Sequence, residues 1–212
     1  MLLVTGATSN SGRFFFKELE KCNFQKKIRC LVRKDSDVSF LKKISLNVEF
    51  FYGDFELEEE IDFAKLLNKV DTIIHIATIL YCEKIFQESK KKGIKWLICL
   101  SSTGVFSKLK KDESLEFKKI EKKISYKYKN LTIVRSTMIY GGVGENIVSK
   151  IIFFMRNFFI FPVFGSGKNL IQPVNAQDLG KAYALIIFNK KKTFGKKYNL
   201  SGKDKVSYIQ LL

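Results

Sequence analysis

The sequence predicts an α/β fold, namely a doubly wound parallel sheet with a small C-terminal portion. Three observations lead to this prediction. Short apolar runs alternate with segments of helix length from Leu2 to about Tyr128, and parallel neighbouring strands need such crossover connections. The first run breaks at Gly6 into small and polar residues, and a helical pattern opens at Gly12. No linker or repeat interrupts the 212 residues, of which 46% are hydrophobic, enough to bury one sizeable core.

The individual elements follow from periodicity and length. The apolar runs are bounded by turn residues and are too short to be buried helices, so they are predicted as strands. The strands are expected at Leu2–Thr5, Ile28–Val32, Val48–Tyr52, Thr72–Ile76, Trp96–Leu100 and Leu131–Val134. The helices are expected at Gly12–Lys21, Glu56–Asn68, Tyr81–Lys92 and Leu115–Tyr128. Ligands bind such sheets beyond the carboxyl ends of the strands, where the strand order reverses, so those ends hold the candidate functional residues.

The chain is strongly basic, with 38 Lys and Arg against 21 Asp and Glu and a net charge of +17. Such a charge raises nucleic acid or an anionic membrane surface as partners. The lysines are spread over nearly every predicted helix and loop, which favours solvated faces, and no groove-reading helix or interleaved aromatic pattern accompanies them. We therefore expect no specific nucleic-acid partner.

Cysteine usage indicates the compartment. Cys22, Cys30, Cys82 and Cys99 are scattered and form neither a CxxC motif nor a pairing with the single histidine. This pattern favours a reducing compartment and argues against a structural metal. The first residues already read as a strand, so we expect no signal peptide and predict a cytoplasmic location.

One segment, residues 147–165, is rich in Phe and Ile but contains Lys150, Arg156 and Pro162. A membrane span would not accommodate these residues well. We expect an amphipathic helix that packs on the domain, and the alternative is a helix that lies on a membrane interface as a peripheral contact.

The turn after the first strand reads GATSNSG from Gly6 to Gly12. Glycine at its first position allows a sharp turn, and glycine at its last position allows the helix to pack closely on the sheet. Backbone amides at the helix start can then hold a pyrophosphate, with hydroxyl donors from Thr8, Ser9 and Ser11. The alternative is a purely structural turn.

The second strand is followed by Arg33 and Lys34. An acidic residue near this point hydrogen-bonds the ribose of NAD, whereas Arg or Lys can pair with the 2′-phosphate of NADP. NADP is therefore the predicted cofactor, and Asp35 and Asp37 keep NAD as the alternative. The two cations could also be solvated surface residues.

These strand ends resemble a known family. The segments VTGATSNSG, YGDFE, IIHIAT, CLSSTGVF, TIVRSTMIYG and QPVNAQDLG…YNLSG occur in the order and spacing of the extended and atypical short-chain dehydrogenase/reductases, the NAD(P)-dependent epimerase/dehydratase group of nucleotide-sugar enzymes. The resemblance runs from Met1 to about Gly202. It implies an NAD(P)-binding Rossmann-like domain over residues 1–140 and a small, or shortened, substrate-binding portion over residues 141–212.

The resemblance also implies roles for residues at matching positions. The family has glycine where Ser9 stands, and we expect cofactor binding to persist with serine there. The phosphate loop would consist of Gly6, Ser9, Asn10, Ser11 and Gly12. The other cofactor contacts would be Asp54 and Phe55 near the adenine, Ala77 and Thr78 near the ribose and pyrophosphate, Ser101 and Ser102 beside the nicotinamide, and Ser136 to Met138 on its other side. His75 is expected to pack rather than to react.

Catalysis in this family uses a tyrosine, a lysine four residues later, and a Ser or Thr that hydrogen-bonds the substrate oxygen. Ser102 matches the serine. Phe117 and Glu121 stand in place of the tyrosine and the lysine, and the tyrosines at 126 and 128 lie too far along the helix. Lys118 is the remaining candidate for an acid or a ribose contact, and the alternative is an exposed lysine on a basic helix face.

The distal part resembles the family's segment in which a strand and a helix close over the sugar nucleotide. Lys168, Gln172 and Asn175 are then candidate substrate contacts, and Asp178 caps or packs the following helix. Our first hypothesis is an NAD(P)-dependent epimerase, dehydratase or reductase that acts on a nucleotide-activated sugar, for surface polysaccharide. The second is a non-catalytic NADP(H)-binding sensor or assembly factor, because the Tyr-x-x-x-Lys pair is missing. The sequence predicts no oligomeric state.

Overall fold

The computed structural model describes residues 1–108, 112–142, 148–158, 163 and 165–211. In this part of the chain one sheet is made of seven strands: β1 (Leu2–Thr5), β2 (Ile28–Val32), β3 (Val48–Tyr52), β4 (Thr72–His75), β5 (Trp96–Ser102), β6 (Leu131–Ser136) and β10 (Lys197–Leu200). Their order is β10-β6-β5-β4-β1-β2-β3, and every neighbouring pair is parallel. The predicted doubly wound α/β fold is confirmed, and its strand order reverses between β1 and β4.

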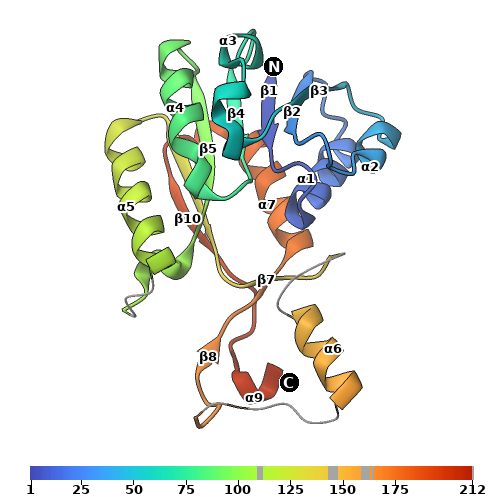
Figure 1. Cartoon of the computed structure of the whole chain (residues 1–212), viewed down its shortest axis with the longest axis vertical. Coiled ribbons are helices and arrows are strands. Elements are labelled where there is room, and N and C mark those ends of the chain that lie inside the picture. Colours follow the sequence, from blue (N-terminus) through green and yellow to red (C-terminus); the bar gives the residue numbers. More distant parts are fainter. Residues whose placement is uncertain (109–111, 143–147, 159–162, 164, 212) are drawn as a thin grey trace.

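Helices cover both faces of the sheet (Figure 1). One face is covered by α1 (Asn10–Lys21) and α7 (Ala176–Phe188), and the other by α3 (Phe63–Leu66), α4 (Cys82–Lys91) and α5 (Asp112–Lys127). Shorter or peripheral helices are α2 (Ser39–Lys43), α6 (Val148–Phe158), α8 (Lys190–Thr193) and α9 (Tyr208–Leu211). Three 3₁₀ helices lie at Phe55–Glu60, Ile79–Tyr81 and Thr103–Phe106.

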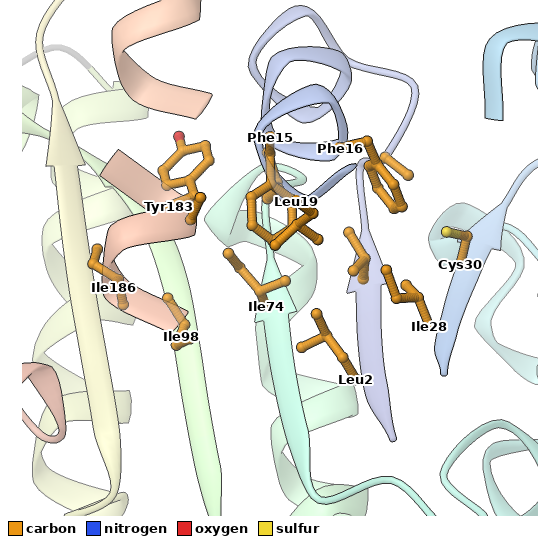
Figure 2. Packing of buried hydrophobic residues seen from close by; sticks show 14 of the residues in the cluster. Leu2, Phe15, Phe16, Leu19, Ile28, Cys30, Ile74, Ile98, Tyr183 and Ile186 are labelled. Carbon is orange, nitrogen blue, oxygen red and sulfur yellow. The ribbon is translucent and has the colours of Figure 1, made fainter. Parts of the chain in front are cut away.

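Alternation along the strands explains the two apolar cores. Successive strand side chains point to opposite faces, so Leu2 and Val4 enter the core beneath α1 and α7, whereas Leu3 enters the core beneath the other helices. Figure 2 shows Phe15 of α1 beside Tyr183 of α7. Their rings meet edge to face with centroids 6.2 Å apart. Because strands buried on both faces read as continuous apolar runs, the sequence pattern could predict them.

A glycine allows α1 and α7 to cross closely. A Cβ atom at Gly180 of α7 would lie 2.6 Å from the backbone carbon of Phe14 and 2.6 Å from the amide nitrogen of Phe15. Such a distance is below any ordinary contact, so a side chain here would push the two helices apart. Residues 176–200, which follow β9, thus return to the main sheet and supply both α7 and its edge strand β10.

The structure differs from the predicted elements in several places. The helix expected over 56–68 is divided, because the Asp62 carboxylate accepts a hydrogen bond from the Lys65 amide at 3.0 Å and starts α3 as a separate helix. Strand β10 was not expected, since the exposed Lys197 and Asn199 hide its apolar pattern. The short α2 was also not expected.

The segment expected to pack as an amphipathic helix contains α6, which stands apart from the sheet in Figure 1. Its exposed fractions are 44% for Ile152, 66% for Phe153 and 59% for Phe158, so the expectation that this face packs on the domain is wrong for the described residues. Within the described ranges, no helix is both long enough and apolar enough to cross a membrane.

Beyond the main sheet, two small sheets tie the C-terminal portion together. The first pairs β8 (Leu170–Ile171) with β11 (Val206–Ser207) in antiparallel fashion. The second pairs β7 (Ile139–Tyr140) with β9 (Val174–Asn175) in parallel. Strand β7 follows β6 in the chain, and β9 directly precedes α7.

Candidate functional site

The turn between β1 and α1 is the segment predicted from the sequence as the phosphate loop. Gly6 has φ of +72°, and a Cβ there would lie 2.6 Å from the Ala77 amide nitrogen at the end of β4. A Cβ at Gly12 would lie 2.4 Å from the Gly6 carbonyl oxygen. Both glycines are therefore required by the close packing of the loop itself. They hold the N-terminus of α1 at the point where the strand order reverses.

Ser9 is the N-cap of α1. Its hydroxyl accepts a hydrogen bond from the Gly12 amide at 3.1 Å, so the side chain turns toward the helix. The backbone amides of Asn10 and Ser11 donate to no group within the described residues. Two amides at a helix N-terminus can bind an anion. The serine that replaces glycine therefore caps the helix and leaves this anion-binding position available.

A cavity of about 310 Å³, here the β2 cavity, lies beside this loop. Phe55 and Tyr81 stack along one wall with centroids 5.8 Å apart and planes 10° apart. The Tyr81 hydroxyl donates to the Glu56 carboxylate at 2.9 Å, and this bond raises the tyrosine's pKa. The lining residues are Gly6, Thr8, Ser9, Leu31, Val32, Arg33, Ser36, Gly53, Asp54, Phe55, Glu56, Ala77 and Tyr81.

Arg33 is the only cation among the described residues that line the β2 cavity. Its Nε atom lies 3.4 Å from the carboxylate of Asp35, and both side chains are largely exposed. Arg13 is held elsewhere, because it donates to the Thr8 carbonyl at 3.2 Å and approaches Asp37 at 3.4 Å. Neither Asp35 nor Asp37 lines the β2 cavity.

A second cavity of about 450 Å³, here the β5 cavity, adjoins the first at Ser9. Its lining residues are Ser9, Asn10, Ser11, Ile76, Thr78, Ile79, Leu100, Ser101, Ser102, Phe117, Ser136, Thr137 and Ile139. No ionisable side chain is present among these described residues. The Thr137 hydroxyl oxygen is buried and has no hydrogen-bond partner within the described chain. A buried polar atom without a partner is costly, so this cavity wall fits a polar ligand.

Helix α5 carries Phe117 and Glu121, the two residues that the sequence resemblance places at the positions of a catalytic tyrosine and lysine. Its inner face carries Phe117, Glu121 and Ile124 at helical spacing. Phe117 lines the β5 cavity. Glu121 is 6% exposed and accepts a hydrogen bond from the Ser101 hydroxyl at 2.7 Å. It also pairs with Arg135 of β6, whose Nε lies 3.0 Å from both carboxylate oxygens. A buried ion pair thus occupies the lysine position.

His75 at the end of β4 has a packing role, as expected. It is fully buried, with Nε2 2.9 Å from the Thr78 carbonyl oxygen and Nδ1 2.8 Å from the Thr5 hydroxyl. Because a carbonyl can only accept, Nε2 carries the proton and Nδ1 accepts from threonine. Burial lowers the pKa of this histidine to about 4. The side chain therefore ties β4 to β1 as a neutral group.

The structure groups the predicted cofactor residues around the two cavities. Gly12 and Met138 line neither cavity. The Met138 carbonyl oxygen accepts a hydrogen bond from the Val174 amide at 2.8 Å. Ser36, Tyr81, Ile79 and Phe117 also line the cavities, although sequence reasoning assigned them no contact. Tyr81 lies six residues after the end of β4, in the short 3₁₀ helix Ile79–Tyr81, and its place beyond a strand end is the signal that could have identified it.

The predicted catalytic and substrate residues are not all brought together. Ser102 lines the β5 cavity, whereas Lys118 lines a separate cavity of about 480 Å³ with Phe106 and two further lysines. Lys168 is exposed before β8. The Gln172 side chain donates to the Gly202 carbonyl at 2.7 Å, and Asn175 caps α7.

None of the three predicted substrate residues lines either cavity. A cluster of three His, Cys, Asp or Glu side chains that could hold a metal is absent from the described residues.

Comparisons by sequence identify no relative. No family model matches the chain, and no curated protein matches it. Comparisons by structure find many solved chains. A dTDP-glucose 4,6-dehydratase from Bacillus anthracis in complex with NAD is 16% identical, with a TM-score of 0.79 over 99% of this chain and 77% of that chain. A UDP-glucuronic acid 4-epimerase from Bacillus cereus in complex with NAD is 17% identical, with a TM-score of 0.82 over 98% of this chain and 79% of that chain.

A third solved structure has the same fold. A UDP-N-acetylglucosamine 4-epimerase from Methanobrevibacter ruminantium in complex with UDP-N-acetylmuramic acid is 17% identical, with a TM-score of 0.75 over 99% of this chain and 79% of that chain. At these identities the likeness shows the fold alone. The seven-stranded parallel sheet of this chain thus has the fold of these nucleotide-sugar epimerases and dehydratases.

Proposed function

We propose that this chain binds NADP(H), with NAD as the weaker alternative, and acts on a nucleotide-activated sugar as an epimerase, dehydratase or reductase. The observation that carries the proposal is the pair of cavities that adjoin at Ser9, over the N-terminus of α1. An extended dinucleotide needs an adenosine site, an anion-binding loop and a nicotinamide site in line, and the described residues supply all three.

The β2 cavity supplies the adenosine site. Phe55 and Tyr81 present stacked aromatic rings at its wall, and Asp54 lies at the turn where its carboxylate accepts the Glu56 amide at 3.0 Å. Arg33 stands directly after β2, where a guanidinium can pair with a 2′-phosphate through two hydrogen bonds. This cation supports NADP, whereas the structural neighbours named above were solved with NAD.

The β5 cavity supplies the reaction site. A bound nicotinamide there would donate or accept hydride. The Ser102 hydroxyl accepts a hydrogen bond from the Gly104 amide at 3.0 Å, so its own hydrogen can be donated to a substrate oxygen. Ile76, Leu100 and Phe117 provide apolar walls.

A specific observation favours a second function, namely non-catalytic binding of NADP(H) as a sensor or an assembly factor. Proton transfer needs an ionisable group within reach of the substrate. Phe117 stands at the tyrosine position, and no ionisable side chain lines the β5 cavity within the described residues. The cofactor could then bind without any turnover.

The experiment that separates these functions uses protein saturated with NADP⁺ or NADPH and a panel of UDP-, GDP- and dTDP-sugars. Absorbance of the reduced nicotinamide and chromatography of the sugar nucleotide are followed over time. Conversion of one sugar nucleotide, and its loss in Ser102→Ala, supports the enzyme. Tight dinucleotide binding with no sugar converted supports the sensor, and no dinucleotide binding refutes both.

A further inference from the structure

Two neighbouring serines at the end of β5 have opposite hydrogen-bonding roles. The Ser101 hydroxyl donates its single hydrogen to Oε2 of Glu121 at 2.7 Å, so only its lone pairs remain for a ligand. The Ser102 hydroxyl accepts from the Gly104 amide at 3.0 Å, so its hydrogen remains. Both residues line the β5 cavity. The wall of this cavity therefore presents one acceptor beside one donor.

The buried ion pair behind Ser101 fixes this role. Arg135 donates to both oxygens of Glu121, and its guanidinium also donates to the Asn199 side chain at 3.2 Å and lies 4.9 Å from the centre of the Phe106 ring. An ionised carboxylate accepts and never donates. Ser101 could turn its hydrogen into the cavity only by giving up a short, buried bond to a charged acceptor, which is costly.

We propose that Glu121 and Arg135 are positioning residues that make Ser101 an acceptor for a neutral N–H or O–H donor on the ligand in the β5 cavity. This inference rests on the proposed function, because that function supplies the ligand. Two groups have the required chemistry: the carboxamide NH₂ of a nicotinamide and a hydroxyl of the sugar. Ser101 would touch that group, and the ion pair acts through Ser101 without touching the ligand.

Glu121→Gln should reverse the polarity of Ser101 with almost no change in shape. The glutamine oxygen would accept from Arg135, and its NH₂ would donate to the Ser101 hydroxyl. The serine hydrogen would then point into the cavity, where it repels a ligand donor. Ser101→Ala removes the acceptor altogether and leaves Glu121 paired with Arg135, so it tests the same contact if the glutamine variant is unstable.

The test is calorimetric titration of the full chain and of both variants with two matched pairs of probes. The first pair is NADP⁺ and its 3-acetylpyridine analogue, in which a methyl group replaces the carboxamide NH₂. The second pair, added to protein saturated with NADP⁺, is UDP-glucose and its 4-deoxy-4-fluoro analogue. Ser125→Ala is the matched control, because Ser125 lies one turn further along α5 and hydrogen-bonds Lys197 outside the β5 cavity.

We expect the unmodified chain to bind the donor-bearing probe of one pair about three- to tenfold more tightly, as one hydrogen bond warrants. Both variants should lose this preference, and the control should keep it. General damage to the fold would weaken both probes of a pair equally. A preference in the first pair assigns the carboxamide as the donor, and a preference in the second pair assigns the sugar hydroxyl.

Two results overturn the inference while the proposed function stands: equal affinities within both pairs for the unmodified chain, or a preference that persists in Ser101→Ala. Failure of the unmodified chain to bind NADP⁺ is a different result. It overturns the proposed function, and the inference with it.

Discussion

Gly12→Ala tests the assignment of the anion-binding loop. The added Cβ would lie 2.4 Å from the Gly6 carbonyl oxygen and 2.8 Å from that of Ala7. Both neighbours are backbone atoms, so the loop must shift by several tenths of an ångström at least, and the overpacking should cost about 1–3 kcal/mol of unfolding free energy. The same shift displaces the amides of Asn10 and Ser11 from the pyrophosphate.

The expected loss of affinity follows from those amides. A hydrogen bond to a charged group contributes about 1.5–3 kcal/mol, so the loss of one such bond should weaken NADP⁺ binding about 10- to 100-fold. Calorimetric titration gives the affinity, and thermal unfolding gives the stability of the same samples.

The matched control is Gly180→Ala in α7. Its Cβ would lie 2.6 Å from the backbone of Phe14 and Phe15, which follow Gly12 in α1. It should lower stability by a similar amount and change affinity less than about threefold. If Gly12→Ala binds NADP⁺ as tightly as the unmodified chain, the loop does not hold the pyrophosphate and the reasoning fails.

Three other substitutions have defined outcomes. Arg33→Ala should weaken NADP⁺ about tenfold and leave NAD⁺ nearly unchanged, because only NADP⁺ carries the 2′-phosphate; equal losses in titrations would remove the argument for that site. Burial lowers the pKa of His75 to about 4, against about 6.5 in the unfolded chain. Below pH of about 6.5 only the unfolded chain takes up this proton, so the free energy of unfolding should fall by about 3 kcal/mol as the pH drops toward 4. Urea unfolding at several pH values should show that the unfolding free energy of His75→Gln declines less with falling pH than that of the unmodified chain. The same dependence on pH in both proteins would contradict this role of His75. Glu121→Ala should cost about 3–5 kcal/mol in chemical denaturation, because it leaves the buried Arg135 unpaired, and a loss below about 1 kcal/mol would mean that the pair is not buried in solution.

Strands β1, β2, β4, β5 and β6 could be predicted because they are largely buried on both faces and read as apolar runs, whereas the half-buried edge strand β3 was predicted from its apolar residues alone. Strand β10 could not, since Lys197 and Asn199 point to solvent and leave too short an apolar pattern. The small sheets of the C-terminal portion have strands of two residues, which no periodicity reveals. The exposure of α6 was also beyond prediction, because an amphipathic pattern does not say what the apolar face meets.

Within the site, local geometry was easier to predict than long-range pairing. The tight turn between β1 and α1 follows from glycines at its two ends, and a serine before a helix is a known cap signal that explains Ser9. The ion pair of Glu121 with Arg135 joins a helix to a strand, and the stacking of Phe55 on Tyr81 joins two different turns. Such contacts depend on how α5 and the 3₁₀ helices pack on the sheet. The periodicity of the sequence does not give the position of one element relative to another.

The central claim is that the two cavities and the loop between them bind one dinucleotide. Calorimetric titration of the unmodified chain with NADPH and with NADH tests it most directly. We predict that one dinucleotide binds per chain, that NADPH is the tighter ligand, and that binding is lost in Gly12→Asp, which places bulk and negative charge against the pyrophosphate. No binding of either dinucleotide, or unchanged binding in Gly12→Asp, would contradict it.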